Sequence, residues 1–79
     1  MSNELENAME QHNRLYQMAY REYLNNDLIA AHQLATEALG KAREFYLHPD
    51  RPAESDPIRC RAAALLTAIE WRSLLVQDE

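Results

Sequence analysis

The chain has 79 residues, a net charge of −5 and one cysteine. This length suits one small domain, the acidic balance argues against binding a nucleic-acid backbone, and a lone Cys60 excludes an internal disulfide or a cysteine-based zinc cluster. With 47% apolar residues and a single glycine, the composition favours an all-α fold over a β-sandwich.

The first predicted helix covers residues 3–24. Asn3 can cap it, and Glu6 completes a capping box. At about 100° per residue the apolar and aromatic side chains gather on one side. They are Leu5, Ala8, Met9, His12, Leu15, Tyr16, Ala19, Tyr20 and Tyr23. We expect His12 to be a partly buried histidine with a local hydrogen bond, because no second metal ligand is spaced for it.

A short turn at residues 25–27 should reverse the chain. Asparagine tolerates left-handed backbone, and Asp27 is a good N-cap for a second helix over residues 28–46. So short a connection implies antiparallel neighbours. Alanines recur at helical spacing on one face of this second helix, at Ala31, Ala35, Ala38 and Ala42. Small residues at the centre of an apolar face let two helices approach closely.

A loop over residues 47–56 precedes a third predicted helix, residues 57–77. Asp56 should be its N-cap and Pro57 its first residue. Its main apolar stripe should close the hairpin from one side, and consists of Ile58, Ala62, Leu65, Leu66, Ile69 and Val76. The sequence therefore predicts a single helical domain over residues 1–79, an all-α three-helix antiparallel bundle.

The third helix also carries a second apolar set on nearly the opposite side. Its members are Cys60, Ala64, Ala68, Trp71 and Leu75. One interpretation is a surface with scattered alanines and one exposed tryptophan. The other is a docking face for another protein or for a second copy of the chain, with Trp71 and Leu75 as anchors.

The hairpin resembles one tetratricopeptide repeat. The residues that carry the resemblance are Leu15, Met18, Ala19, Tyr23, Asn26, Asp27, Leu28, Ala31, Ala35 and Ala38. Two features depart from the family: Asn26 replaces the usual glycine, and the next helix starts later than the repeat period demands. The resemblance implies a peptide-binding concave face on the first helix, at Asn13, Tyr16, Tyr20 and Tyr23. Of these, Tyr20 lies at the margin of the apolar stripe and is the best contact candidate.

Nearly the whole chain is similar to domains of the microtubule-interacting-and-trafficking (MIT) type. The alanine-spaced hairpin, the polar linker and the Ile58-Arg59 start of the third helix carry this likeness. It implies a three-helix bundle whose grooves beside the third helix bind short helical or extended motifs, often with basic residues. The acidic charge is compatible with such a partner.

The tripeptide His48-Pro49-Asp50 is the signature of J-domains, where it lies between two helices and stimulates the Hsp70 ATPase. It occupies the equivalent loop here. The basic helix and the Leu-Ala…Tyr pattern that precede the tripeptide in that family are absent. A J-domain-like co-chaperone remains an alternative function.

Catalysis, a metal and a cofactor are not expected. His12, His32 and His48 lie on different elements without metal-ligand spacing, and Cys60 has no base placed to make it a nucleophile. We expect a module that binds another protein or a peptide, with a basic peptide favoured by the charge and a homodimer through the third helix as the alternative. The sequence shows no secretory signal and no membrane span, so we expect a cytoplasmic protein.

Overall fold

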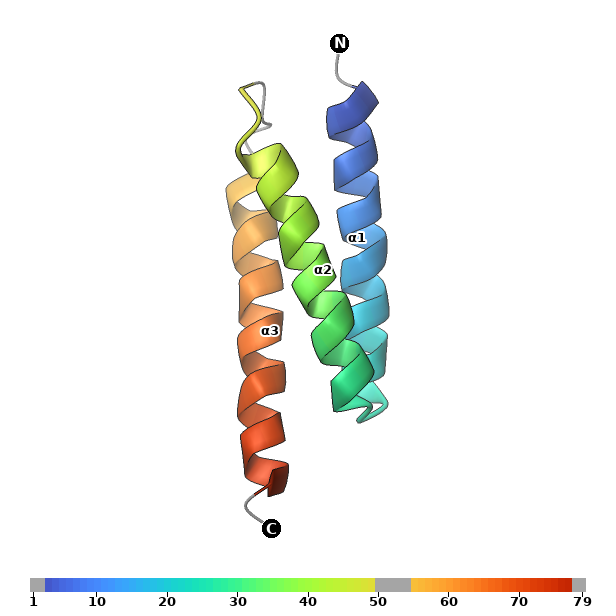
Figure 1. Cartoon of the computed structure of the whole chain (residues 1–79), viewed down its shortest axis with the longest axis vertical. Coiled ribbons are helices and arrows are strands. Elements are labelled where there is room, and N and C mark those ends of the chain that lie inside the picture. The colour runs from blue at the N-terminus through green and yellow to red at the C-terminus, as the bar shows by residue number, and fades with distance from the viewer. Residues whose placement is uncertain (1–2, 50–54, 78–79) are drawn as a thin grey trace.

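The computed structural model describes residues 3–49 and 55–77, and within these ranges it contains helices and no strand. The helices are α1 (Asn3–Leu24), α2 (Leu28–Tyr46) and α3 (Ser55–Gln77). Consecutive helices are antiparallel: in Figure 1, α1 runs down the long axis of the molecule, α2 runs up and α3 runs down. The prediction of an all-α three-helix bundle is confirmed.

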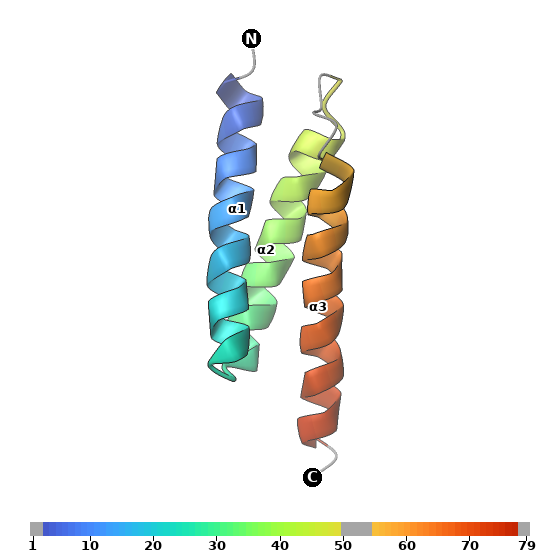
Figure 2. The ribbon, with the colours of Figure 1, turned by 180° about the vertical axis from the view of Figure 1, so that it is seen from behind.

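The central helix is α2, which packs along both α1 and α3. Direct contacts between α1 and α3 are few by comparison. Seen from the front, α2 lies before the other two helices, and from behind α1 and α3 flank it (Figures 1 and 2). Both views also show the C-terminal part of α3 extending past the turn between α1 and α2. The third helix therefore packs mainly against one helix of the hairpin.

The turn between α1 and α2 uses the residue types that the sequence predicted. Asn26 has a φ of 66°, in the left-handed region that asparagine tolerates. The Asp27 side chain caps α2, because its Oδ1 accepts a hydrogen bond from the backbone N–H of Ala30 at 3.2 Å. The backbone N–H of Asp27 in turn donates to the carbonyl oxygen of Glu22 at 2.9 Å. The turn thus supplies a local hydrogen-bond partner to each of the two helix ends.

A line of alanines forms the interface between α1 and α2. Their exposed fractions are 0–1%, and they are Ala19, Ala31, Ala35, Ala38 and Ala42. Ala42 clusters with Leu5 near one end of the hairpin, and Ala31 and Ala35 cluster with residues of α3 near the other. The predicted alanine packing is confirmed.

On α3 the buried residues are Ala62, Leu65 and Ile69, all members of the predicted main stripe. The helix begins at Ser55, two residues before the predicted start at Pro57. A proline is tolerated throughout the first turn of a helix, since none of the N–H groups there has an intrahelical acceptor. Pro57 therefore lies in the first turn of α3, as predicted, but it is not the first residue of the helix.

Some predicted features lie outside what the structure describes. These are Asp50 and the loop residues 51–54, the side chains of Asn3 and Asp56 as helix caps, and the side chain of Val76 in the main stripe. Within the two described ranges, none of the helices combines the length and the apolarity that crossing a bilayer requires.

Candidate functional site

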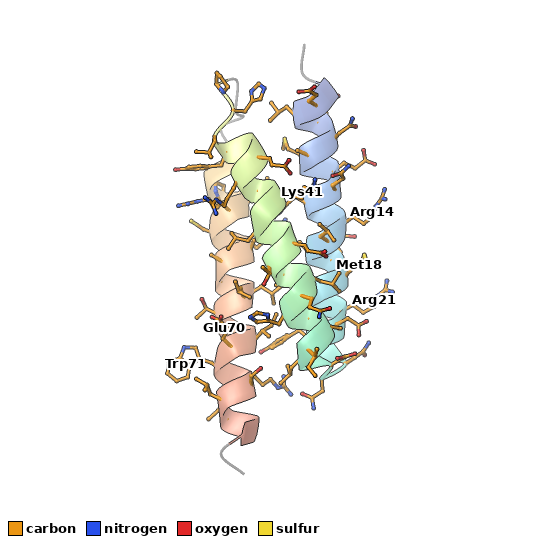
Figure 3. All side chains as sticks on the ribbon, in the orientation of Figure 1. Arg14, Met18, Arg21, Lys41, Glu70 and Trp71 are labelled. Carbon is orange, nitrogen blue, oxygen red and sulfur yellow. The ribbon has the colours of Figure 1, made fainter. Side chains whose placement is uncertain are left out.

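The second apolar face of α3 is largely uncovered. We call it the α3 face and define it by Cys60, Ala64, Ala68, Trp71 and Leu75. Trp71 and Leu75 keep 64% and 65% of their surface exposed, and Cys60 and Ala64 are exposed as well. Only Ala68 is half-buried. Trp71 points away from α2 (Figure 3), so the expectation that it is an exposed tryptophan is confirmed.

More apolar surface lies near the same end of the molecule. Leu74, Leu24 and Ile29 are all exposed, and the sequence did not single them out. Two shallow hollows lie along the seam of α2 and α3, and both are bordered by His32 and Ser73. Leu74 borders one hollow and Ile29 the other. The C-terminal half of α3 thus presents apolar side chains on more than one side.

Tyr20, the candidate on α1, belongs to a row of stacked rings. Its ring centroid lies 6.3 Å from that of Tyr16, which lies 6.4 Å from that of His12. Tyr20 is the exposed end of the row, at 46%, whereas Tyr16 packs against the core. This agrees with the expectation that Tyr20 is marginal and Tyr16 part of the core.

Two arginines of α3 reach across to this face of α1. The guanidinium carbon of Arg61 lies 4.1 Å from the ring centroid of Tyr16, and that of Arg72 lies 5.3 Å from the ring centroid of Tyr23. A nitrogen of Arg61 also lies 3.4 Å from the side-chain oxygen of Asn13. Arginine over a tyrosine ring is a cation–π arrangement. The structure thus brings the candidate tyrosine face of α1 and the third helix together through side chains that sequence reasoning missed.

A signal for these arginines was present in the chain. Arg61 and Arg72 are eleven residues apart, which is about three helical turns and places them on one side of α3. What the spacing could not say is which helix lies beside them.

His12 is the one buried polar side chain among the described residues, and its exposed fraction is 0%. Its Nδ1 lies 2.6 Å from the carbonyl oxygen of Ala38 on α2. A carbonyl can only accept, so Nδ1 carries the proton and donates. Burial holds the pKa of His12 below its usual value, although the hydrogen bond to Ala38 raises it and the charge of Arg61 lowers it further. His12 therefore links the two helices of the hairpin as a neutral ring, and its partner is 26 residues away and not local.

Other candidate chemistry is not assembled in the described part of the chain. His48 and Pro49 follow α2 after Leu47, but Asp50 of the same tripeptide lies outside the described residues. Among residues 3–49 and 55–77, no group of three or more His, Cys, Asp or Glu side chains could hold a metal ion.

Comparison of the chain with protein-family models, with curated proteins and with solved structures finds no match.

Proposed function

We propose that this protein is a non-enzymatic interaction module, similar to tetratricopeptide-repeat and MIT-type domains, that binds a helical or linear segment of a partner protein along the α3 face. The observation that carries the proposal is the exposure of Trp71 and Leu75, at 64% and 65%. Both lie on a helix whose opposite side is already buried against α2 by Leu65 and Ile69.

The physical reason is the cost of leaving such side chains in water. Burying a large apolar side chain is worth about 1.5–3 kcal/mol, and tryptophan is among the residues most enriched at the centres of protein interfaces. Ala64 and Ala68 lie between Cys60 and Trp71 on the same face, so an incoming helix could approach α3 closely, as α1 approaches α2. The buried alanine interface of the hairpin supports the family resemblance in the same way.

The proposal is tested by selecting peptides from a displayed random library with the full chain. Trp71 is the only tryptophan, so its fluorescence reports directly on burial of the α3 face. We expect selected peptides to shift its emission to shorter wavelength and to lose binding to the Trp71→Glu variant.

Leu24→Glu is the matched control, because Leu24 is also 65% exposed but lies on α1. Peptides that bind wild type, Trp71→Glu and Leu24→Glu equally would contradict the proposal. If no peptide is selected and sedimentation shows a wild-type dimer that Trp71→Glu converts to a monomer, the face is covered by a second copy and the chain is a self-associating protein.

A further inference from the structure

The α3 face is bordered by Arg61 and Arg72, and no ion pair among the described residues involves either guanidinium group. Among the described residues, ion pairs join Glu10 to Arg14 and Lys41 to Glu44, and His32 lies 3.6 Å from Glu70. None of these contacts involves an arginine of α3. Arg61 and Arg72 instead lie on the rings of Tyr16 and Tyr23. This is unexpected in a chain with 13 acidic and 8 basic residues.

A guanidinium that rests on a ring can still bind a carboxylate. A ring contacts the group from one side, whereas the N–H donors of a guanidinium lie around the rim of its plane. Arg61 uses one nitrogen towards Asn13, at a long 3.4 Å, and both arginines are exposed. The tyrosines hold the two guanidinium groups in place, which lowers the entropy that a bidentate contact with a ligand would cost.

The two arginines lie along one edge of the α3 face. At about 100° per residue, Arg72 is within about 60° of Ala68 and Leu75, and Arg61 is about 60° from Ala64. The two are separated by about 16 Å along the helix axis, which matches about three turns of a helix laid alongside. Arg72 is about 100° from Trp71 around the helix, so a docked segment that covers Trp71 and Leu75 would meet the two guanidinium groups along its edge nearer α1.

No acidic side chain of α3 in the described part offsets this charge. Glu70 lies towards α2, where its Oε2 is 3.6 Å from Nε2 of His32. The net charge of −5 favours a basic partner, but charges in water are screened beyond about 8 Å at physiological salt. Charges in direct contact with the docked segment decide its composition.

We propose that the segment bound on the α3 face is an acidic amphipathic helix, with carboxylates that pair with Arg61 and Arg72 and an apolar stripe that covers Trp71 and Leu75. This inference rests on the proposed function and adds the chemistry of the partner.

The test uses the peptides selected by the full chain. We expect the selected pool to be enriched in Glu and Asp that flank an apolar stripe of helical period. For the tightest peptide, replacing its acidic residues with glutamine should weaken binding by about tenfold at low salt, the effect of two partly exposed ion pairs. High salt should reduce this difference in affinity between the acidic peptide and its glutamine version.

Variants of the chain locate the effect. Arg61→Gln with Arg72→Gln should weaken binding of the acidic peptide to the level of its glutamine version. Arg59→Gln is the matched control, since the guanidinium carbon of Arg59 lies 4.4 Å from the ring centroid of Tyr46 on α2 and away from the α3 face. If the double glutamine variant does not fold, Arg61→Lys with Arg72→Lys keeps the charge and should keep the preference for the acidic peptide over the glutamine one.

The outcomes separate the two proposals. Selected peptides that are basic or uncharged, and that still need Trp71, would overturn the acidic partner and leave the interaction module standing. An acidic pool whose binding is insensitive to Arg61 and Arg72 would also overturn it. If no peptide is selected, the proposed function fails and this inference fails with it.

Discussion

Two surfaces of the molecule have similar composition but differ in burial. One is the interface between α1 and α2, which is buried, and the other is the α3 face, which is largely exposed. Both are rich in alanine at helical spacing, yet Ala35 and Ala38 are at most 1% exposed whereas Ala64 lies in solvent. The difference comes from the neighbour and not from the helix itself. A second helix with an alanine of its own, Ala19, lies against the first set, and in the described structure nothing lies against the second. A small-residue stripe is therefore a means of close approach, and whether it is used depends on a partner.

The largest expected effect contrasts the two sides of α3. Ile69→Ala should lower the free energy of unfolding by about 2–5 kcal/mol, since Ile69 is fully buried and its loss leaves a cavity against α2. Leu74→Ala on the exposed side should change it by less than about 0.5 kcal/mol. Urea denaturation followed by circular dichroism measures both. Equal losses would mean that the exposed side of α3 is packed in solution.

The next effect compares one substitution at two alanines. Ala35→Leu should cost about 1–3 kcal/mol, because the added carbons have no space between α1 and α2. Ala64→Leu, on the exposed α3 face, should be close to neutral in the isolated chain. The same denaturation series tests the pair, and a costly Ala64→Leu would show that the α3 face is already occupied.

His12 should make the stability of the hairpin interface depend on pH. Because its folded-state pKa lies below the ordinary 6.5, the unfolded chain binds more protons as the pH falls through that value. The contribution of neutral His12 to the free energy of unfolding is therefore fully present above about pH 6.5 and is lost as the pH falls through the lower folded-state pKa. The melting temperature should therefore decrease as the pH is lowered from neutral to mildly acidic values.

His12→Gln provides the comparison for that pH dependence. Glutamine keeps an N–H donor for the Ala38 carbonyl but does not titrate, so the melting temperature of the variant should depend less on pH between neutral and mildly acidic values. The variant should also be less stable than the wild type at neutral pH, because glutamine does not fill the space of the fully buried ring. His32→Gln is the control substitution, because it removes an exposed histidine outside the interface of α1 with α2. If the pH dependence of the melting temperature is lost in His32→Gln and kept in His12→Gln, the effect belongs to the seam between α2 and α3.

Local sequence patterns were sufficient for most of the fold. The helical period located three helices, Asn26 and Asp27 located the turn, and the alanine spacing identified the face on which α1 and α2 meet. These features depend on residues a few positions apart. The start of α3 was displaced because proline limits the first turn without selecting its first residue.

The interactions that the sequence did not reveal join residues far apart in the chain. His12 binds the Ala38 carbonyl 26 positions away, and Arg61 contacts Asn13 from 48 positions away. Such pairs depend on which helices are neighbours and on how far each is shifted along the other. Periodicity within one helix carries neither quantity, so the candidate α3 face could be proposed from sequence but its charged border could not.

The smallest expected effect concerns backbone freedom at two positions of the hairpin. A Cβ added at Gly40 would meet no atom within 4 Å, and its φ is not positive, so Gly40→Ala should stabilise the chain by about 0.5–1 kcal/mol. Asn26 is the opposite case, because its φ of 66° suits glycine, and Asn26→Ala should cost about 1 kcal/mol while Asn26→Gly should not. Thermal melts of the three variants order them. A destabilising Gly40→Ala would mean that this side of α2 is approached closely by something in solution, and the hairpin would then share the incomplete burial of the α3 face.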